Sequence, residues 1–130
     1  MKICVFGASS ISLDKVYYNE TEKLGIEMAK RGHTLIFGGG DTGVMGSVAR
    51  GVKSENGQII SVSPKFFDLP GILFKDVTET IFTNSMSERK SVMEDISDAF
   101  IVAPGGTGTF EEFFEVFTLK QLGQITKPIA

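Results

Sequence analysis

The sequence has no tryptophan, and only one cysteine, one histidine and four prolines among its 130 residues. A lone cysteine excludes a disulfide framework, and the apolar run around Cys4 favours a small core residue in a reducing compartment. His33 is expected on a turn far from the loops that could carry function. We therefore expect neither a histidine-based catalytic triad nor a metal site.

Long runs of apolar residues and long runs of basic residues are also absent. No apolar stretch approaches the roughly 18 residues of a membrane span, and residues 7–10 turn to glycine and serine too early for a signal peptide. The net charge is −3, and the longest basic runs are the pairs 30–31 and 89–90, so no nucleic-acid stripe is predicted. We expect a cytoplasmic protein that binds neither membrane nor nucleic acid.

What the chain does contain is typical of a globular protein: 42% hydrophobic residues, 11 phenylalanines and 22% charged residues. The length allows one domain, residues 1–130, that needs no disulfide or metal. Apolar runs predict strands at 3–6, 34–37, 58–62, 77–82 and 99–103, with one more strand beginning at 127–130. Helical spacing predicts helices at 14–30, 44–56, 85–97 and 109–122, and residues 64–76 are expected to form a loop or lid.

This alternation predicts an α/β fold, a doubly wound Rossmann-like parallel sheet with helices on both faces. In such sheets the ligand lies at the carboxyl ends of the strands, and the loops that leave the predicted strands are small or polar. Eight of the 15 glycines lie in the segments 38–46 and 105–108. Glycine lets a ligand approach the main chain, and a helix N-terminus beyond it offers N–H groups to phosphate. Tight turns with packing roles are the alternative.

The first of these segments also matches the dinucleotide-binding pattern G-x-G-x-x-G, as Gly38, Gly40 and Gly43. That pattern normally follows the first strand and needs an acidic residue near the end of the next one. Here the next strand ends in the segment 61–64, Ser-Val-Ser-Pro, which has no carboxylate. We therefore give this interpretation less weight.

Charged residues stand out near two predicted helix starts. Ser85 and Glu88 form a capping box, but Arg89 and Lys90 follow in the first turn and a half, where the helix dipole disfavours cations. An anionic ligand at the strand ends would compensate; charges that simply reach into solvent are the alternative. The same type of box, Thr109 with Glu112, gives Glu112 a structural explanation.

The position of Glu112, however, is one turn behind a phosphate-type glycine loop, where a carboxylate can reach the sugar of a bound nucleotide. Glu111 is expected to face solvent. A stripe of four phenylalanines recurs at helical spacing in this segment and is expected to belong to the core: Phe110, Phe113, Phe114 and Phe117.

Four segments together resemble one known family, the LOG ("lonely guy") cytokinin riboside 5'-monophosphate phosphoribohydrolases. Residues 104–112 fit its PGGxGTxxE pattern, and residues 5–10 resemble its opening strand and Gly-Ser-Ser turn. Residues 38–46 resemble its GGGxxGLMG loop, and residues 86–90 its MHxRK element. The four occur in the family's order with similar spacing, so the resemblance covers essentially the whole chain.

The resemblance implies that the N-glycosidic bond of a purine-type nucleoside 5'-monophosphate is hydrolysed to free base and ribose 5-phosphate, without a cofactor. It implies catalytic roles for Arg89 and Glu112. Substrate or phosphate contacts are implied for Ser9, Gly39, Gly40, Met86, Lys90, Gly105, Gly106, Thr107, Gly108 and Thr109. The base, of cytokinin type or plain adenine, stays open. The resemblance also implies a homodimer with active sites near the interface.

The chain departs from the family pattern in two places. Ser87 stands where the motif has histidine, which we expect to affect contacts with the base more than the reaction. Family members continue past residue 130 through a strand and a helix, so we expect a truncated form or a sheet edge that is covered in another way. Six apolar residues of the predicted lid are expected to form either an interface or part of the core: Phe66, Phe67, Leu69, Ile72, Leu73 and Phe74.

Two other functions compete with hydrolysis. Proteins of the same superfamily bind nucleotides or a molybdenum cofactor without cleaving them, and a carrier would keep both glycine loops. It would not need Arg89 and Glu112 at the sugar, so these residues favour the enzyme. The label "lysine decarboxylase", sometimes attached to the family, requires a pyridoxal phosphate Schiff-base lysine, and no strand-edge lysine other than Lys90 is suitably placed.

Overall fold

The computed structural model describes all residues, 1–130. The strands are β1 (Lys2–Phe6), β2 (Thr34–Phe37), β3 (Ile59–Pro64), β4 (Glu79–Thr83) and β5 (Ala99–Val102). The helices are α1 (Lys15–Lys30), α2 (Gly43–Ser54), α3 (Met86–Ile96) and α4 (Thr107–Gln121), with a short 3-10 helix at Lys65–Phe67. The predicted elements are confirmed, with bounds that differ by a few residues.

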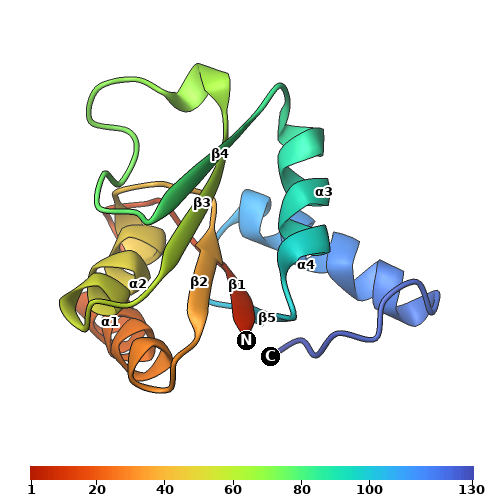
Figure 1. Cartoon of the computed structure of the whole chain (residues 1–130), viewed down its shortest axis with the longest axis horizontal. Coiled ribbons are helices and arrows are strands. Elements are labelled where there is room, and N and C mark those ends of the chain that lie inside the picture. Colours follow the sequence, from red (N-terminus) through yellow and green to blue (C-terminus); the bar gives the residue numbers. More distant parts are fainter.

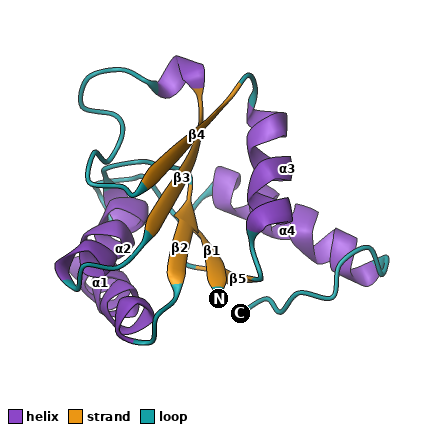
Figure 2. Cartoon of the chain, viewed as in Figure 1, coloured by secondary structure: helices purple, strands orange, loops and turns teal.

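All neighbouring strands pair in parallel, in the order β4-β3-β2-β1-β5. Helices α1 and α2 lie on one side of the sheet and α3 and α4 on the other (Figures 1 and 2). This arrangement confirms the doubly wound fold. The strand order reverses at β1, which has β2 on one side and β5 on the other, so a crevice is expected where the loops after β1 and β5 diverge.

The sheet separates two apolar cores, because successive side chains of a strand point to opposite faces. In β1, Val5 packs toward α1 and α2, whereas Cys4 and Phe6 pack toward α3 and α4. Cys4 is fully buried, as its apolar run predicts, and burial raises the pKa of its thiol. In α2, Val44, Val48 and Val52 are fully buried, each worth roughly 1.5–3 kcal/mol relative to an exposed side chain.

Helices α1 and α2 touch backbone to backbone, and two glycines make this possible. A Cβ on Gly51 would collide with the carbonyl oxygen of Glu22, and a Cβ on Gly25 would collide with that of Val48. Each glycine therefore has a packing role here, and the pair lies far from the strand ends that carry the functional loops.

The phenylalanine stripe of α4 is a prediction that the structure shows to be wrong. Phe110 is 58% exposed, Phe114 55% and Phe117 39%. The rings stack on one another along the helix instead of packing into the sheet, and Val116 is the fully buried hydrophobic residue of α4. Helical spacing identifies an apolar face but does not say whether a partner within the chain covers it.

The last residues run beside β5, which agrees with the predicted start of a further strand. Ile129 forms a parallel bridge with Phe100, and the amide of Val102 donates to the carbonyl of Ala130 at 2.8 Å. Each of the helices is too short or too polar to span a lipid bilayer.

Candidate active site

A cavity of about 600 Å³ opens at the carboxyl ends of the strands, which is within the usual 300–1,000 Å³ range of small-molecule sites. Its walls come from the loops after β1 and β2, the lid between β3 and β4, and the first turns of α3 and α4. Nine residues expected from the sequence line it: Ser9, Gly40, Met86, Arg89, Gly106, Thr107, Gly108, Thr109 and Glu112. The amide of Ala8 donates to the carbonyl of Pro104 at 3.0 Å and joins the two glycine-rich loops beside the crevice.

The N-terminus of α4 faces this cavity without a side-chain cap. Gly106 is the N-cap residue and Thr109, which was expected in that role, is buried within the first turn. The predicted capping box of Thr109 with Glu112 is therefore wrong. No acidic residue occupies the first turn, so its N–H groups and the positive end of the helix dipole are left for an anion.

The start of α3 behaves differently, and its predicted capping box is confirmed. The Ser85 hydroxyl accepts from the amide of Glu88 at 3.1 Å. The Glu88 carboxylate reaches back and accepts from the amide of Asn84 at 2.7 Å, one residue earlier than in the standard box. Glu88 thus has a structural role, which leaves Arg89 as the unexplained charge of this turn.

Arg89 is a buried cation with few partners. Its side chain is 7% exposed, its Nε is buried without a hydrogen bond, and one terminal nitrogen lies 3.5 Å from Met86 Sδ. Burial lowers the pKa of the guanidinium, and the charge of Glu112 partly offsets this. Because a buried charge is costly unless it is paired, Arg89 is poised to bind an anion in the cavity.

Glu112 lines the same cavity from the second turn of α4. Burial raises the pKa of its carboxyl to about 7, with smaller contributions from Glu111 and Glu115, while Arg89 and Lys90 lower it. The structure removes the capping explanation for Glu112 and places it next to an uncapped helix start. A carboxylate and a guanidinium from two different helices thus line the same crevice.

Three of the expected contact residues do not line the cavity. Lys90 points away from it and pairs with Glu111 and Glu115 of α4. Gly39 lies under the lid, where its carbonyl accepts from the amide of Phe74 at 2.8 Å. Gly105 packs against the Thr109 side chain and the Ala8 amide and lines a neighbouring groove.

Sequence reasoning missed the apolar side of the cavity as part of the site. The sequence predicts that segment 64–76 forms a loop or lid, and it indicates an interface or the core as the place of its apolar side chains. Phe67, Ile72 and Leu73 line the cavity, whereas Phe66 and Leu69 are exposed and Phe74 is buried. Antiparallel bridging of Leu73 with Gly40 holds the lid across the mouth. The aromatic content of the loop was the available signal.

Ser87 is exposed and lies outside the lining of the cavity.

Gly38 provides the seat for Arg89, and a substitution there tests that placement. A Cβ on residue 38 would overlap the Arg89 guanidinium and lie 2.8 Å from Met45 Cε. We expect Gly38→Ala to displace the guanidinium and to slow the nucleotide hydrolysis that the resemblance implies roughly tenfold or more, since small misplacements in a site are costly. The free energy of unfolding, measured by urea titration, should fall by no more than about 1 kcal/mol because a side-chain end can move. Unchanged turnover would show that Arg89 does not act from this seat.

Comparison with known proteins finds one matching family model and similar relatives with one shared name. A family model described as "Possible lysine decarboxylase" matches residues 45–130. The Arabidopsis thaliana protein named cytokinin riboside 5'-monophosphate phosphoribohydrolase LOG2 is 37% identical over 128 residues, which cover 98% of this chain and 60% of the relative. A Mycobacterium tuberculosis protein of the same name, without the suffix, is 44% identical over 107 residues, covering 82% and 57%. This chain spans about three fifths of these relatives' length.

Solved structures with the same fold include cofactor-binding proteins. The molybdenum cofactor carrier protein of Chlamydomonas reinhardtii superposes with a TM-score of 0.80 at 26% identity, over 99% of this chain and 75% of that one. The molybdenum cofactor binding protein of Rippkaea orientalis gives a TM-score of 0.79 at 25% identity with the same coverage. The fold is thus shared by proteins whose names give different functions, and the side chains of the cavity must distinguish them.

Proposed function

Since the chain belongs to the family described as "Possible lysine decarboxylase", with LOG-type phosphoribohydrolases among its relatives, we propose that it hydrolyses a purine-type nucleoside 5'-monophosphate. The products are the free base and ribose 5-phosphate. The observation that carries this proposal is that Glu112, Arg89 and the uncapped start of α4 line one cavity.

The geometry supports a division of the substrate between three walls. The N–H groups at Thr107, Gly108 and Thr109 suit the 5'-phosphate, because a helix N-terminus is an anion site. The apolar lid and Met86 suit the flat face of a base. This leaves the ribose between them, at the wall where Glu112 and Arg89 lie.

The bond that breaks joins C1' of the ribose to the base nitrogen, and a water oxygen forms the new bond to C1'. One water proton ends on the departing base. Positive charge develops on the ribose as the bond breaks, and a carboxylate such as that of Glu112 stabilises it while it orients water or a ribose hydroxyl. Arg89 positions the phosphate, the carboxylate or the departing base from the same wall.

A chromatographic assay tests the proposal. The purified chain is incubated separately with AMP, with N6-isopentenyladenosine monophosphate and with adenosine, and free base is measured. We expect release from the two monophosphates, little from adenosine, which lacks the anchoring phosphate, and none with an Arg89→Ala variant. Binding of AMP without release by the wild type would contradict the hydrolase.

The pH dependence of turnover follows from Glu112. Its pKa is raised to about 7, mainly by burial, and the reaction uses the carboxylate form. The value of kcat/KM for AMP is therefore expected to rise about tenfold per pH unit below pH 7 and to level off above it, since kcat/KM reports groups of the free enzyme. A rise centred near 4.5, the ordinary value for a glutamate, would show that another group or an unburied Glu112 governs the rate.

A carrier is the second candidate, and the specific observation in its favour is the structural likeness to molybdenum cofactor carrier proteins. It does not account for Glu112 and Arg89. Decarboxylation of lysine finds no support, because no lysine lines the cavity for a Schiff base. The homodimer stays a prediction, to which the exposed phenylalanine face of α4 is suited, and the cytoplasmic location also stays a prediction.

A further inference from the structure

Lys90 makes the only ion pairs that join two helices in this chain. Its Nζ lies 2.6 Å from Glu111 Oε1 and 2.8 Å from Glu115 Oε2, so one lysine of α3 contacts two carboxylates of α4. The other ion pairs lie within α1 and the residue after it, or join Arg50 of α2 to the loop before that helix. Lys90 is therefore an electrostatic link between α3 and α4.

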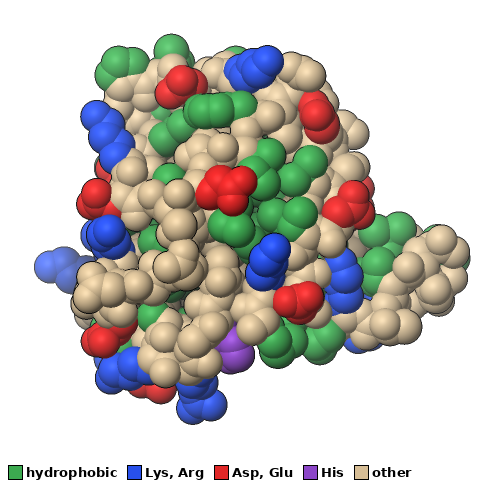
Figure 3. Space-filling view, in the orientation of Figure 1, with side chains coloured by type: hydrophobic (Ala, Val, Ile, Leu, Met, Phe, Trp, Pro, Cys, Tyr) green, Lys and Arg blue, Asp and Glu red, His purple; other side chains and the backbone are tan.

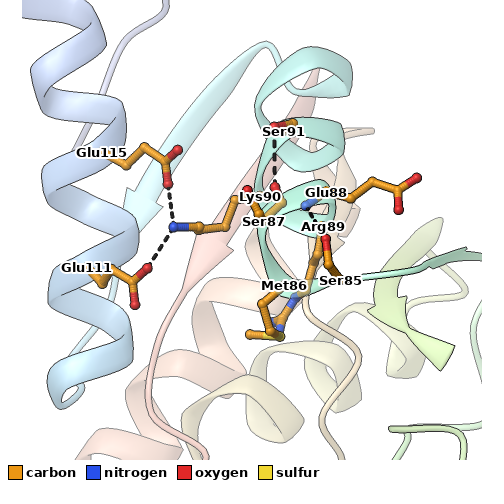
Figure 4. A network of polar contacts seen from close by, with 9 residues as sticks. All are labelled: Ser85, Met86, Ser87, Glu88, Arg89, Lys90, Ser91, Glu111 and Glu115. Atoms are coloured by element: carbon orange, nitrogen blue, oxygen red, sulfur yellow. Dashed lines mark hydrogen bonds and ion pairs between the residues drawn. The ribbon is translucent and has the colours of Figure 1, made fainter. Parts of the chain in front are cut away.

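The link ends next to both proposed catalytic residues. Lys90 follows Arg89 in α3, and Glu111 precedes Glu112 in α4. Figure 4 shows that the Lys90 side chain extends across to α4, whereas Arg89 leaves α3 in another direction, beside Met86. Since a helix backbone is stiff over one residue, fixing Lys90 on Glu111 and Glu115 also fixes the spacing between the two neighbouring side chains.

We infer that Lys90 is a positioning residue, which fixes α4 against α3 through Glu111 and Glu115 and so holds Glu112 at the cavity beside Arg89. The inference rests on the proposed function, and it gives Lys90 a different role from the substrate contact that the resemblance implies. The Lys90 side chain is 20% exposed, and Glu115 Oε2 is buried with Lys90 as its one ionic partner. The pair with Glu115 is partly buried and therefore less screened by water than an exposed pair, whereas the Glu111 side chain is 65% exposed and its pair is the weaker of the two.

Lys90 also tunes the charges around it. Four carboxylates surround it, from α3 and α4: Glu94, Glu111, Glu112 and Glu115. The other nearby cations are Arg89, which faces Glu112, and Lys127, which faces Glu94. The charge of Lys90 lowers the pKa of Glu112, so its removal raises that pKa and favours the protonated, inactive form.

The first test is kinetic and compares three variants. Lys90→Met is expected to lower kcat for base release roughly ten- to a hundredfold, with KM within about twofold of the wild type. The rise of kcat/KM with pH should also move to higher pH, because kcat/KM reports groups of the free enzyme. Lys90→Arg should recover most of the wild-type kcat and of the wild-type pH profile because it keeps the charge. Lys23→Met, which removes an exposed lysine paired with Glu20 on α1, is the matched control and should leave both values unchanged.

The second test does not depend on turnover. The carboxyl of Glu112 is titrated by ¹³C NMR in the wild type and in Lys90→Met, with Glu112→Gln to assign its signal, and AMP binding is measured by calorimetry. We expect a higher pKa for Glu112 in Lys90→Met and a Kd for AMP within about twofold. A Kd or KM raised tenfold with kcat and the Glu112 pKa unchanged would place Lys90 on the substrate and overturn the inference. If the wild type releases no base, the proposed function fails, while titration and binding still decide the place of Lys90.

Discussion

Glu112→Gln is expected to abolish base release while nucleotide binding persists. Glutamine keeps the size of the side chain but carries no charge, so the positive charge that develops on the ribose loses its partner. Removal of one electrostatic contact of this kind costs about a hundred- to a thousandfold in kcat. Release of adenine from AMP under saturating conditions measures the loss, and calorimetric titration with AMP measures the binding that should remain.

The control for this variant is Glu55→Gln, the same chemical change at the exposed end of α2, which lies outside the cavity. It should leave both release and binding unchanged. Equal loss of release and binding in Glu112→Gln would assign Glu112 a structural role. Full activity would instead show that hydrolysis does not use the carboxylate of Glu112, the one carboxylate that lines the cavity.

The largest expected effect on stability is at the crossing of α1 and α2. Gly51→Ala would place a Cβ on the Glu22 carbonyl and 3.1 Å from the Ile26 amide nitrogen, so two backbones must move apart. We expect the free energy of unfolding to fall by about 3 kcal/mol and Tm by about 10 °C, at the upper end of overpacking effects. Urea and thermal unfolding, followed by circular dichroism, measure both.

Gly108→Ala is the matched comparison for stability, because this glycine also lies in a helix but has no neighbour where a Cβ would point. Alanine stabilises a helix relative to glycine by roughly 0.5–1 kcal/mol, so its unfolding midpoint should stay level or rise. A similar fall in both variants would mean that the loss at Gly51 does not come from the contact between α1 and α2.

Much of the fold could be predicted because its strands are buried on both faces. Continuous apolar runs such as 34–37 leave little choice of structure, and the glycine loops that follow the strands indicate the working edge of the sheet. The outer face of α4 could not be predicted. Its spacing is that of a core helix, yet Phe110 and Phe114 are exposed, since the sheet is already covered by Val116 and α3.

In the site, the sequence could indicate which residue types gather but not which way each one points. Arg89 and Lys90 are adjacent cations in the same turn, and only the structure separates the one that is buried at the cavity from the one that links α3 to α4. A capping role for Glu112 is excluded because α4 begins at Thr107, which the sequence does not reveal. On the face seen in Figure 3, acidic and basic side chains are interspersed, which agrees with the absence of a basic stripe in the sequence.

The order of the chain has a consequence for synthesis. The cavity combines the loop after β1, the first strand, with α4, the last helix, and the Ala8 amide joins the two through Pro104. A growing polypeptide therefore contains no complete site until residue 112 has left the ribosome and β5 has paired with β1. On the proposed function, we expect a chain released before Glu112 to cleave no nucleotide, and the appearance of activity to follow the pairing of β5 with β1.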